Sequence, residues 1–124
     1  MYKVQEATKK GYALAKSGDS INISYSNCMS KRGRVGKQLV NTLTTSCNHA
    51  VVTNEYRIRK ITPREAYRLM GFTDRQFDLA AKECSNTQLY KQAGNSIVVN
   101  VLEEIFKNLL EDEINRETEG KLNL

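Results

Sequence analysis

Residues that usually build catalytic and metal-binding sites are scarce in this 124-residue sequence, which has one histidine, three cysteines and one proline. Cys28, Cys47 and Cys84 are odd in number and widely spaced, which argues against a disulfide framework and favours a reducing compartment. Cys47 and His49 form an isolated C-x-H pair, so we expect an ordinary strand position there and no metal site. Nucleophilic and general-base catalysis therefore have few candidate residues.

Long hydrophobic runs are also missing. No stretch is long enough to span a bilayer, and the N-terminal Met-Tyr-Lys is not followed by the apolar region of a signal peptide. These absences predict a soluble, cytoplasmic protein. The length suits one domain with its own core and is short for most cofactor-dependent enzymes.

Charge is distributed unevenly along the chain. The formal net charge is +5, but residues 1–60 carry 11 Lys and Arg against 3 Asp and Glu, whereas residues 61–124 carry 8 against 11. A positive half joined to a mildly negative half predicts an anionic partner, with nucleic acid the first candidate and an acidic protein the second.

Residues 30–37 form a basic stretch with two glycines and almost nothing to bury; its cations are Lys31, Arg32, Arg34 and Lys37. Such a loop gains little from burial, so either solvent or a ligand surrounds it. A solvated loop is the ordinary interpretation. Contact with phosphates or bases is the more specific interpretation, because arginines can form bidentate hydrogen bonds with phosphates or guanine edges.

The first sixty residues predict short strands. Turns are expected at residues 9–11 and 17–20, with apolar alternation in residues 12–15 and 21–25. Three later segments are β-branched or alternating and predict a small antiparallel meander. They are residues 39–45, 50–53 and 56–61.

The proline belongs to a sharp turn from strand to helix. Thr62 can cap this helix, Pro63 fits its first position and Glu65 completes a capping box, while Gly71 ends it. Two arginines four residues apart share one face of the helix, and the ordinary interpretation of that face is a solvated surface. They are Arg64 and Arg68.

Further capping signals lie downstream. Thr73 begins a predicted helix that runs toward Lys82, and Ser85 begins a turn of helix through Lys91. Apolar residues then recur at three- and four-residue intervals from Ile97 to Leu110, which predicts a long amphipathic helix too hydrophobic to stand alone in water. Residues 111–124 lose this periodicity and are expected to fray.

Gly94, Asn95 and Ser96 precede that helix. We expect this corner to lie at the helix N-terminus, where free backbone amides and the helix dipole favour an anion such as a carboxylate. Simple N-capping by Asn95 or Ser96 is the alternative.

Two motifs in the second half resemble the last two sequence motifs of the cytosine-5 DNA methyltransferases. The first is RKITPRE at residues 59–65 with RLMGF at residues 68–72, and the second is YKQAGNSIVVNV at residues 90–101. Earlier segments, RGRVG at residues 32–36 and NTLT at residues 41–44, resemble the target-recognition region of the same family. The resemblance covers residues 5–110.

This resemblance implies an α+β fragment: a small β-rich target-recognition domain followed by helices that complete an α/β S-adenosylmethionine-dependent fold. It divides the chain into a DNA-binding region at residues 1–61, a helical part of the catalytic fold at residues 62–110 and a tail at residues 111–124.

The resemblance also implies roles for single residues. Candidate DNA contacts are Lys31, Arg32, Arg34, Lys37, Thr42 and Leu43, with Thr42 and Leu43 near the target base pair. Gly94, Asn95 and Ser96 are candidate contacts of S-adenosylmethionine. Structural braces, buried or paired, are expected at Arg59, Arg64, Glu65 and Arg68.

Other family motifs are not present in this sequence. There is no F-x-G-x-G cofactor loop, no Glu-Asn-Val segment and no Pro-Cys nucleophile, since Pro63 is the single proline. The base must be extruded and attacked by a thiolate, so we expect no catalytic residue in this chain and no methyl transfer by it alone.

The resemblance predicts the C-terminal portion of a methyltransferase from a restriction-modification or phage system, as a natural subunit or a truncated form. Its partners would be double-stranded DNA and the N-terminal catalytic portion, with self-association through residues 96–110 a further possibility. The alternative is a stand-alone DNA-binding regulatory module that derives from a methyltransferase. A binder of acidic proteins remains a third, generic possibility.

Overall fold

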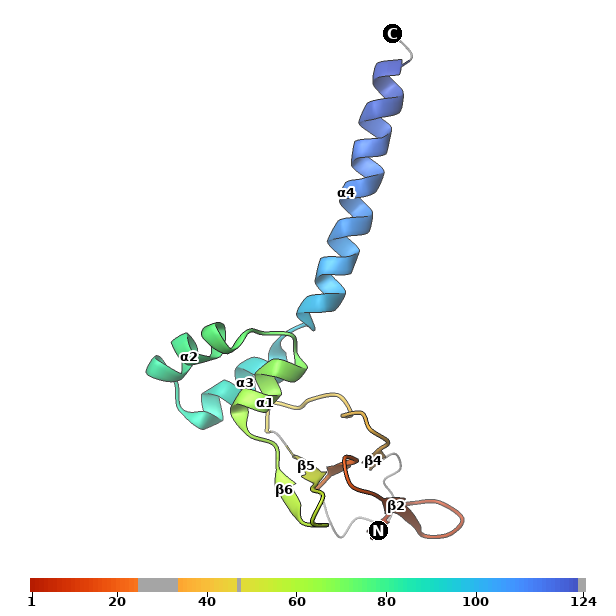
Figure 1. Cartoon of the computed structure of the whole chain (residues 1–124), viewed down its shortest axis with the longest axis vertical. Helices are drawn as coiled ribbons and strands as arrows, with labels where there is room; N and C mark the ends of the chain where they lie inside the picture. Colours follow the sequence, from red (N-terminus) through yellow and green to blue (C-terminus); the bar gives the residue numbers. More distant parts are fainter. Residues whose placement is uncertain (25–33, 47, 123–124) are drawn as a thin grey trace.

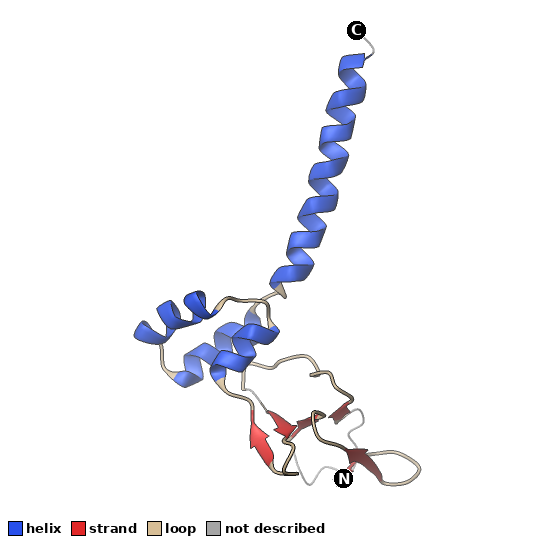
Figure 2. Ribbon diagram, in the orientation of Figure 1, coloured by secondary structure: helices blue, strands red, loops and turns tan. Residues whose placement is uncertain are grey.

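The computed structural model describes residues 1–24, 34–46 and 48–122. Its elements divide into a β-rich part formed by the first sixty residues and a helical part formed by the rest (Figures 1 and 2). The chain therefore has the α+β composition that the sequence predicts, and the described part contains no helix long and apolar enough to cross a membrane.

An N-terminal hairpin pairs strand β1 (Tyr2–Gln5) with strand β2 (Tyr12–Ala15), with Tyr2 opposite Ala15 and Gln5 opposite Tyr12. Backbone hydrogen bonds close its tip, including one from the Glu6 amide to the Gly11 carbonyl at 3.2 Å, and the Thr8 hydroxyl donates to the Tyr12 carbonyl at 3.4 Å. Gly11 has φ +74°, a conformation that glycine adopts without strain.

Four short antiparallel strands form the second sheet in the order β4 (Val35–Gly36), β3 (Ser20–Asn22), β5 (His49–Val52) and β6 (Ile58–Lys60). Ile21 and Val52 of this sheet form a small buried core with Ala15 of the hairpin, and Tyr2 and Val4 of the hairpin pack against it. The predicted pairing of the last two meander strands is confirmed by β5 and β6.

The prediction of a strand at residues 39–45 is wrong. This segment has no strand structure, and β3 occupies the place beside β5 that the meander required. Strand propensity measures how well side chains fit a half-buried pleated surface. Here Val40 and Leu43 pack instead against the core of the helical part.

Three helices follow: α1 (Pro63–Leu69), α2 (Asp74–Glu83) and α3 (Asn86–Asn95). The capping boxes predicted at Thr62 and Thr73 are confirmed in both of their hydrogen bonds, and Ser85 caps α3 through the Gln88 amide. The helix that begins after Ser85 is thus longer than expected, because it continues through Gly94 and Asn95.

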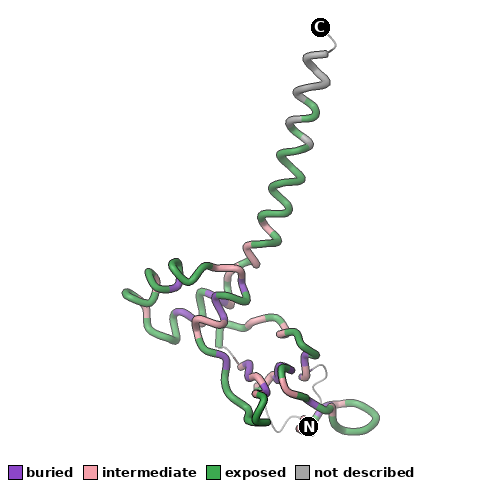
Figure 3. Tube along the Cα trace, viewed as in Figure 1, coloured by how far each residue is buried: buried purple, intermediate pink, exposed green. Residues whose placement is uncertain are grey.

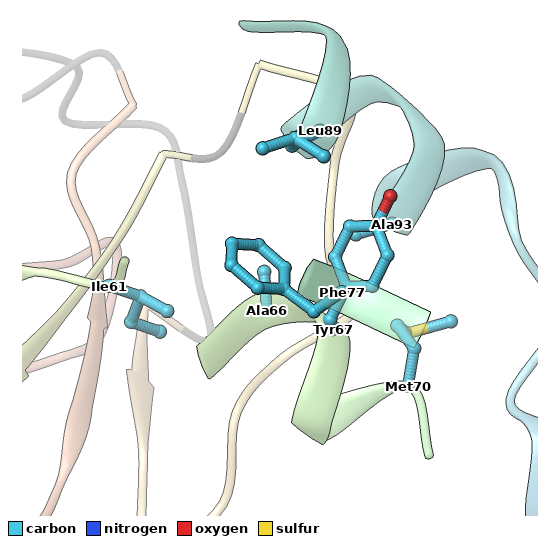
Figure 4. Close-up of a cluster of buried hydrophobic side chains, with 7 residues drawn as sticks. All are labelled: Ile61, Ala66, Tyr67, Met70, Phe77, Leu89 and Ala93. Carbon is cyan, nitrogen blue, oxygen red and sulfur yellow. The ribbon is translucent and has the colours of Figure 1, made fainter. Parts of the chain in front are cut away.

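The helical core lies among these three helices (Figure 4). The Tyr67 and Phe77 rings meet edge to face with centroids 5.2 Å apart, and Leu89 is only 1% exposed. The buried side chains of this core are Ile61, Ala66, Tyr67, Met70, Phe77, Leu89 and Ala93.

Helix α4 (Val99–Leu122) projects from this body as a long rod (Figure 1). It continues beyond the end that the sequence predicted at Leu110, so the loss of periodicity does not end the helix. Its described side chains are mostly exposed (Figure 3). Apolar residues that are about half exposed on or just before it are Ile97, Val101, Ile105, Phe106, Leu109 and Leu110.

Candidate functional site

A connecting segment, residues 37–45, runs from β4 to the helices and is held at its start by Asp19. The Asp19 carboxylate accepts hydrogen bonds from the Lys16 amide at 2.9 Å and the Gln38 amide at 3.2 Å, and it pairs with the Lys37 ammonium at 3.1 Å. Asp19 is 2% exposed, and these bonds, chiefly that from the Lys16 amide, lower its pKa to about 2. A buried carboxylate with this many donors is ionised at neutral pH.

The turn that follows is tight. The Ser20 hydroxyl donates to the Leu39 carbonyl at 2.6 Å, and a Cβ at Gly36 would clash with that same carbonyl oxygen. Gln38 has φ +54°, which is uncommon for a residue with a side chain and is stabilised here by its bonds to Asp19. Sequence reasoning missed the role of Asp19 and Ser20 here, because their partners in the connecting segment, Gln38 and Leu39, are 19 residues away in sequence.

The far end of the connecting segment lies against α3. A Cβ at Gly94 would be 2.6 Å from both the Thr44 carbonyl carbon and the Thr45 amide nitrogen. Glycine at this position therefore allows the segment to approach the helix closely. Together, Asp19 and Gly94 fix the two ends of the span that carries Thr42 and Leu43.

A groove of about 480 Å³ lies between the connecting segment and the helices. Thr42 is exposed and Leu43 is half buried. The groove brings both residues together with Gly94 and Ser96, so two candidate sets that are far apart in sequence share one surface. Its lining residues are Leu39, Val40, Asn41, Thr42, Leu43, Leu69, Met70, Gly94, Ser96 and Val98.

The Gly94–Ser96 corner differs from the expected arrangement. Gly94 and Asn95 end α3, and Ser96 is its C-cap, while α4 begins only at Val99. The prediction of a site at the N-terminus of the long helix is therefore wrong, since the C-terminal end of a helix dipole repels an anion. The Ser96 hydroxyl donates to the Ala93 carbonyl at 2.8 Å, and Asn95 is exposed.

Arg34 does not occupy the position of a DNA contact. It is 4% exposed, and its guanidinium donates to the carbonyls of Gln5 at 3.2 Å and Ser24 at 3.0 Å. Glu6 accepts the Arg34 amide at 2.6 Å. The prediction of a DNA contact at Arg34 is wrong in this structure, because its side chain is buried within the β-rich part.

The other predicted cations of the basic stretch differ in status. The Lys37 side chain is 61% exposed although its ammonium pairs with Asp19. Lys31 and Arg32 lie outside the described residues.

His49 lies in β5, as an ordinary strand residue would, and it is fully buried. Neither ring nitrogen has a hydrogen-bond partner among the described residues, and burial lowers the pKa of the imidazole, so His49 is neutral near pH 7. Across residues 1–24, 34–46 and 48–122, no cluster of side chains could hold a metal ion.

Exposed ion pairs connect β6, α1 and α2. Arg59 binds the Glu65 carboxylate through two bonds of 2.9 and 2.7 Å, which are the main cause that lowers the Glu65 pKa to about 2. Arg68 pairs with Asp74 at 2.7 Å. The face predicted as a solvated surface is exposed, but its guanidinium groups are paired.

Arg64 adds a second contact to this network. It pairs with Asp78 at 2.6 Å, and its guanidinium carbon lies 4.6 Å from the centroid of the Phe77 ring. This stacking connects the exposed pair to the helical core, since Phe77 is buried.

The model of the C-5 cytosine-specific DNA methylases matches residues 2–111, which is most of the chain. The chain belongs to this family. The connecting segment, the groove and the Gly94–Ser96 corner all lie within the matched residues.

Several curated methyltransferases are similar in sequence. The orphan methyltransferase M.SPRI of Bacillus phage SPR is 51% identical over 82 residues, which cover 63% of this chain and 19% of the relative. The type II methyltransferase M2.ScrFI of Lactococcus lactis subsp. cremoris is 54% identical over 59 residues, or 48% of this chain and 16% of the relative.

A third relative is the putative type II methyltransferase M.BsuMIIP of Bacillus subtilis strain 168, 49% identical over 82 residues that cover 63% of this chain and 18% of the relative. The chain therefore spans less than a fifth of the length of these family members. No solved structure matches the chain.

Proposed function

We propose that this chain is the C-terminal portion of a DNA (cytosine-5-)-methyltransferase, where it recognises the target duplex and completes the cofactor pocket. The observation that carries the proposal is the groove that unites Thr42 and Leu43 with Gly94 and Ser96. These residues come from two segments that are far apart in sequence, and they meet in this groove. The family match favours an enzyme that methylates cytosine in duplex DNA, and the relatives, a phage orphan methyltransferase and a type II methyltransferase, favour a phage or restriction-modification enzyme.

On the DNA side, Thr42 and Leu43 face the target base pair in this proposal, and the cations Lys31, Arg32 and Lys37 contact phosphates. Arg34 supports the sheet instead of touching DNA, because it is buried. The fixed ends of the connecting segment at Asp19 and Gly94 restrict where Thr42 and Leu43 can lie. A preorganised span of this kind loses little conformational entropy on binding.

On the cofactor side, Asn95 and Ser96 would contact S-adenosylmethionine, which supplies the methyl group when bound. The exposed Asn95 amide fits this role well. Ser96 fits it as a hydrogen-bond acceptor, because its hydroxyl proton is directed at the Ala93 carbonyl. Gly94 acts indirectly, since the Thr44–Thr45 backbone covers its Cα.

The apolar face of α4 is the proposed docking surface for the catalytic portion of the enzyme. Ile105, Phe106 and Leu109 are each about half exposed, which is costly for side chains of this size in water. Self-association through the same face is the competing arrangement. Gel filtration separates the two, since self-association predicts a dimer in the absence of any partner.

The ion pairs of Arg59, Arg64, Glu65 and Arg68 act as braces in this proposal. They connect β6, the last strand of the β-rich part, to helices α1 and α2. Exposed pairs contribute little energy singly, so we assign them to orientation more than to stability.

Methyl transfer needs a thiolate nucleophile, and the sequence contains no Pro-Cys pair, since Pro63 is followed by Arg64. We therefore expect DNA binding without turnover. The test incubates the purified chain with duplex DNA and labelled S-adenosylmethionine. Binding that weakens steeply with salt supports the proposal, and incorporation of label above background would contradict the assignment of chemistry to another chain.

A further inference from the structure

The β1–β2 hairpin carries four exposed lysines that the proposed function does not use: Lys3, Lys9, Lys10 and Lys16, called here the hairpin lysines. None of them takes part in the ion pairs of the described residues. No carboxylate of the described residues therefore neutralises these four charges in an ion pair.

Carboxylates near the hairpin are already engaged. Glu6 is 7% exposed and accepts the Arg34 amide, and Asp19 is 2% exposed and pairs with Lys37. Neither can neutralise an ammonium group on the outer surface. The hairpin thus presents positive charge with no exposed acid of its own.

Strand register places part of this charge on one face. Lys3 is opposite Leu14 and Gln5 is opposite Tyr12, and all four are exposed, while Tyr2 and Val4 turn toward the small core. The Lys3 ammonium lies 5.1 Å from the centroid of the Tyr12 ring. The outer face of the hairpin thus carries the Lys3 charge beside the exposed Tyr12 ring.

The tip of the hairpin projects away from the helices (Figure 1). Lys9 and Lys10 lie in a turn that backbone hydrogen bonds close, between Glu6 and Gly11 and between Thr8 and Gly11. The fold does not use the lysine side chains of this turn. The two adjacent ammonium groups at this exposed tip are therefore accessible to an anionic partner.

Lys37 connects the hairpin to the connecting segment, which carries the proposed DNA contacts Thr42 and Leu43. Its ammonium donates to the Leu14 carbonyl of β2 as well as to Asp19, so it lies against the hairpin at the start of the connecting segment. We propose that the outer face of the hairpin binds the phosphate backbone of duplex DNA beside the bases that Thr42 and Leu43 read. This inference rests on the proposed function of the connecting segment.

Lysine ammonium groups recognise phosphate as point charges and carry no base-specific pattern. The hairpin therefore adds affinity for any duplex, whereas Thr42 and Leu43 discriminate between sequences. The two surfaces predict different responses to mutation.

The experiment measures binding of the 124-residue chain to a fluorescent duplex by anisotropy between 50 and 200 mM salt. The test variant is Lys9→Ala with Lys10→Ala. The matched control is Lys82→Ala with Lys91→Ala, which removes two exposed lysines from α2 and α3. Far-UV circular dichroism checks that both variants keep the fold.

In the Lys9 and Lys10 variant, the negative slope of log K against log salt should become shallower by about 1.8, the amount for two lost phosphate contacts. Affinity at low salt should fall about tenfold, and equally for all duplexes. The control variant should keep the wild-type slope. An unchanged slope in the test variant would overturn the hairpin inference while leaving the proposed function intact. An equal loss in both variants would also overturn it, because net charge alone would then explain the effect.

Two further outcomes complete the design. A wild-type chain without salt-dependent affinity for duplex DNA contradicts both the proposed function and the hairpin inference. Binding to poly-L-glutamate that depends on Lys9 and Lys10, with DNA binding unaffected, would assign the hairpin to an acidic protein and would likewise overturn the inference.

Discussion

The β-rich part and the helical part of this molecule are held together by different kinds of contact. Buried polar groups organise the β-rich part: Glu6, Asp19, Ser20, Arg34 and His49 are all at most 7% exposed. The helical part has a buried apolar cluster, and its ion pairs lie on the surface. Hydrogen bonds of buried groups depend on geometry and protonation, whereas apolar contacts depend on volume.

This difference suits the proposed division of work. A surface that reads DNA needs a backbone held in one shape, and directed bonds from Asp19 and Ser20 provide it for the connecting segment. A part that docks on a catalytic domain needs a stable platform, and the cluster around Tyr67 and Leu89 provides that.

The largest effect is expected in the apolar cluster. Leu89→Ala should lower the free energy of unfolding by about 2–5 kcal/mol, because Leu89 is 1% exposed and its loss leaves a cavity. Leu79→Ala in α2 is the control, with a change within about 0.5 kcal/mol, since Leu79 is 56% exposed. Urea titration measures both, and equal effects would contradict the position of the core.

Gly94→Ala tests the close approach between the two parts. Alanine should stabilise an isolated helix by up to about 1 kcal/mol, but here its Cβ would meet the Thr44–Thr45 backbone. We expect a net loss of about 1–3 kcal/mol. Thr87→Ala in the exposed first turn of α3 is the control; a stabilising Gly94→Ala would show that the connecting segment does not lie against α3.

Asp19→Asn tests the polar organisation of the β-rich part. It keeps the size of the side chain but removes the charge that Lys37 and two backbone amides satisfy, and we expect a loss of about 1–3 kcal/mol at pH 7. The substitution should accelerate amide hydrogen exchange at Gln38 and its neighbours, and should change it less in α1. Unchanged exchange at Gln38 would contradict the role of Asp19.

Acid should weaken the β-rich part through the same residue. The folded pKa of Asp19 is about 2, below its ordinary value of 3.8, so its contribution is complete above about pH 5 and is lost as pH falls toward 2. We expect a loss of about 2 kcal/mol from this group, with a smaller share from the partly exposed Glu65, whose pKa is also about 2. Asp19→Asn should flatten the profile, and an equally steep profile would refute the assignment.

The smallest effect is expected at the exposed ion pairs. Arg68→Ala should cost no more than about 1 kcal/mol, because the Arg68 and Asp74 side chains are 57% and 48% exposed and water screens their attraction. A double-mutant cycle with Asp74→Ala gives the coupling energy. A coupling well above this value would mean that the pair stabilises the helical part as strongly as its core does.

Local signals in the sequence predicted the local structure well. The capping boxes at Thr62 and Thr73 depend on bonds between residues three apart, and both formed as expected. The alternation that produced β6 and the helical periodicity of α4 are likewise properties of neighbouring residues.

Structure that depends on distant partners could not be predicted in this way. The connecting segment has the propensity of a strand, but its apolar side chains pack against the helical core. From the sequence alone, Arg34 is predicted to be an exposed cation, because its acceptors, the carbonyls of Gln5 and Ser24, are distant in sequence. The helix through Gly94 was missed because glycine suggests a break, and only Thr44 and Thr45 explain why glycine is required there.

Complementation tests the central claim most directly. The chain is co-expressed with a family member's catalytic portion that carries the Pro-Cys and Glu-Asn-Val segments, and methylation of duplex DNA is measured with labelled S-adenosylmethionine. Phe106→Glu on the exposed apolar face of α4 should abolish complementation, whereas Asn108→Glu, with the same change of charge, should retain it. The proposal predicts sequence-specific incorporation of label only when both chains are present, and the absence of incorporation from a complex that forms and binds DNA would contradict it.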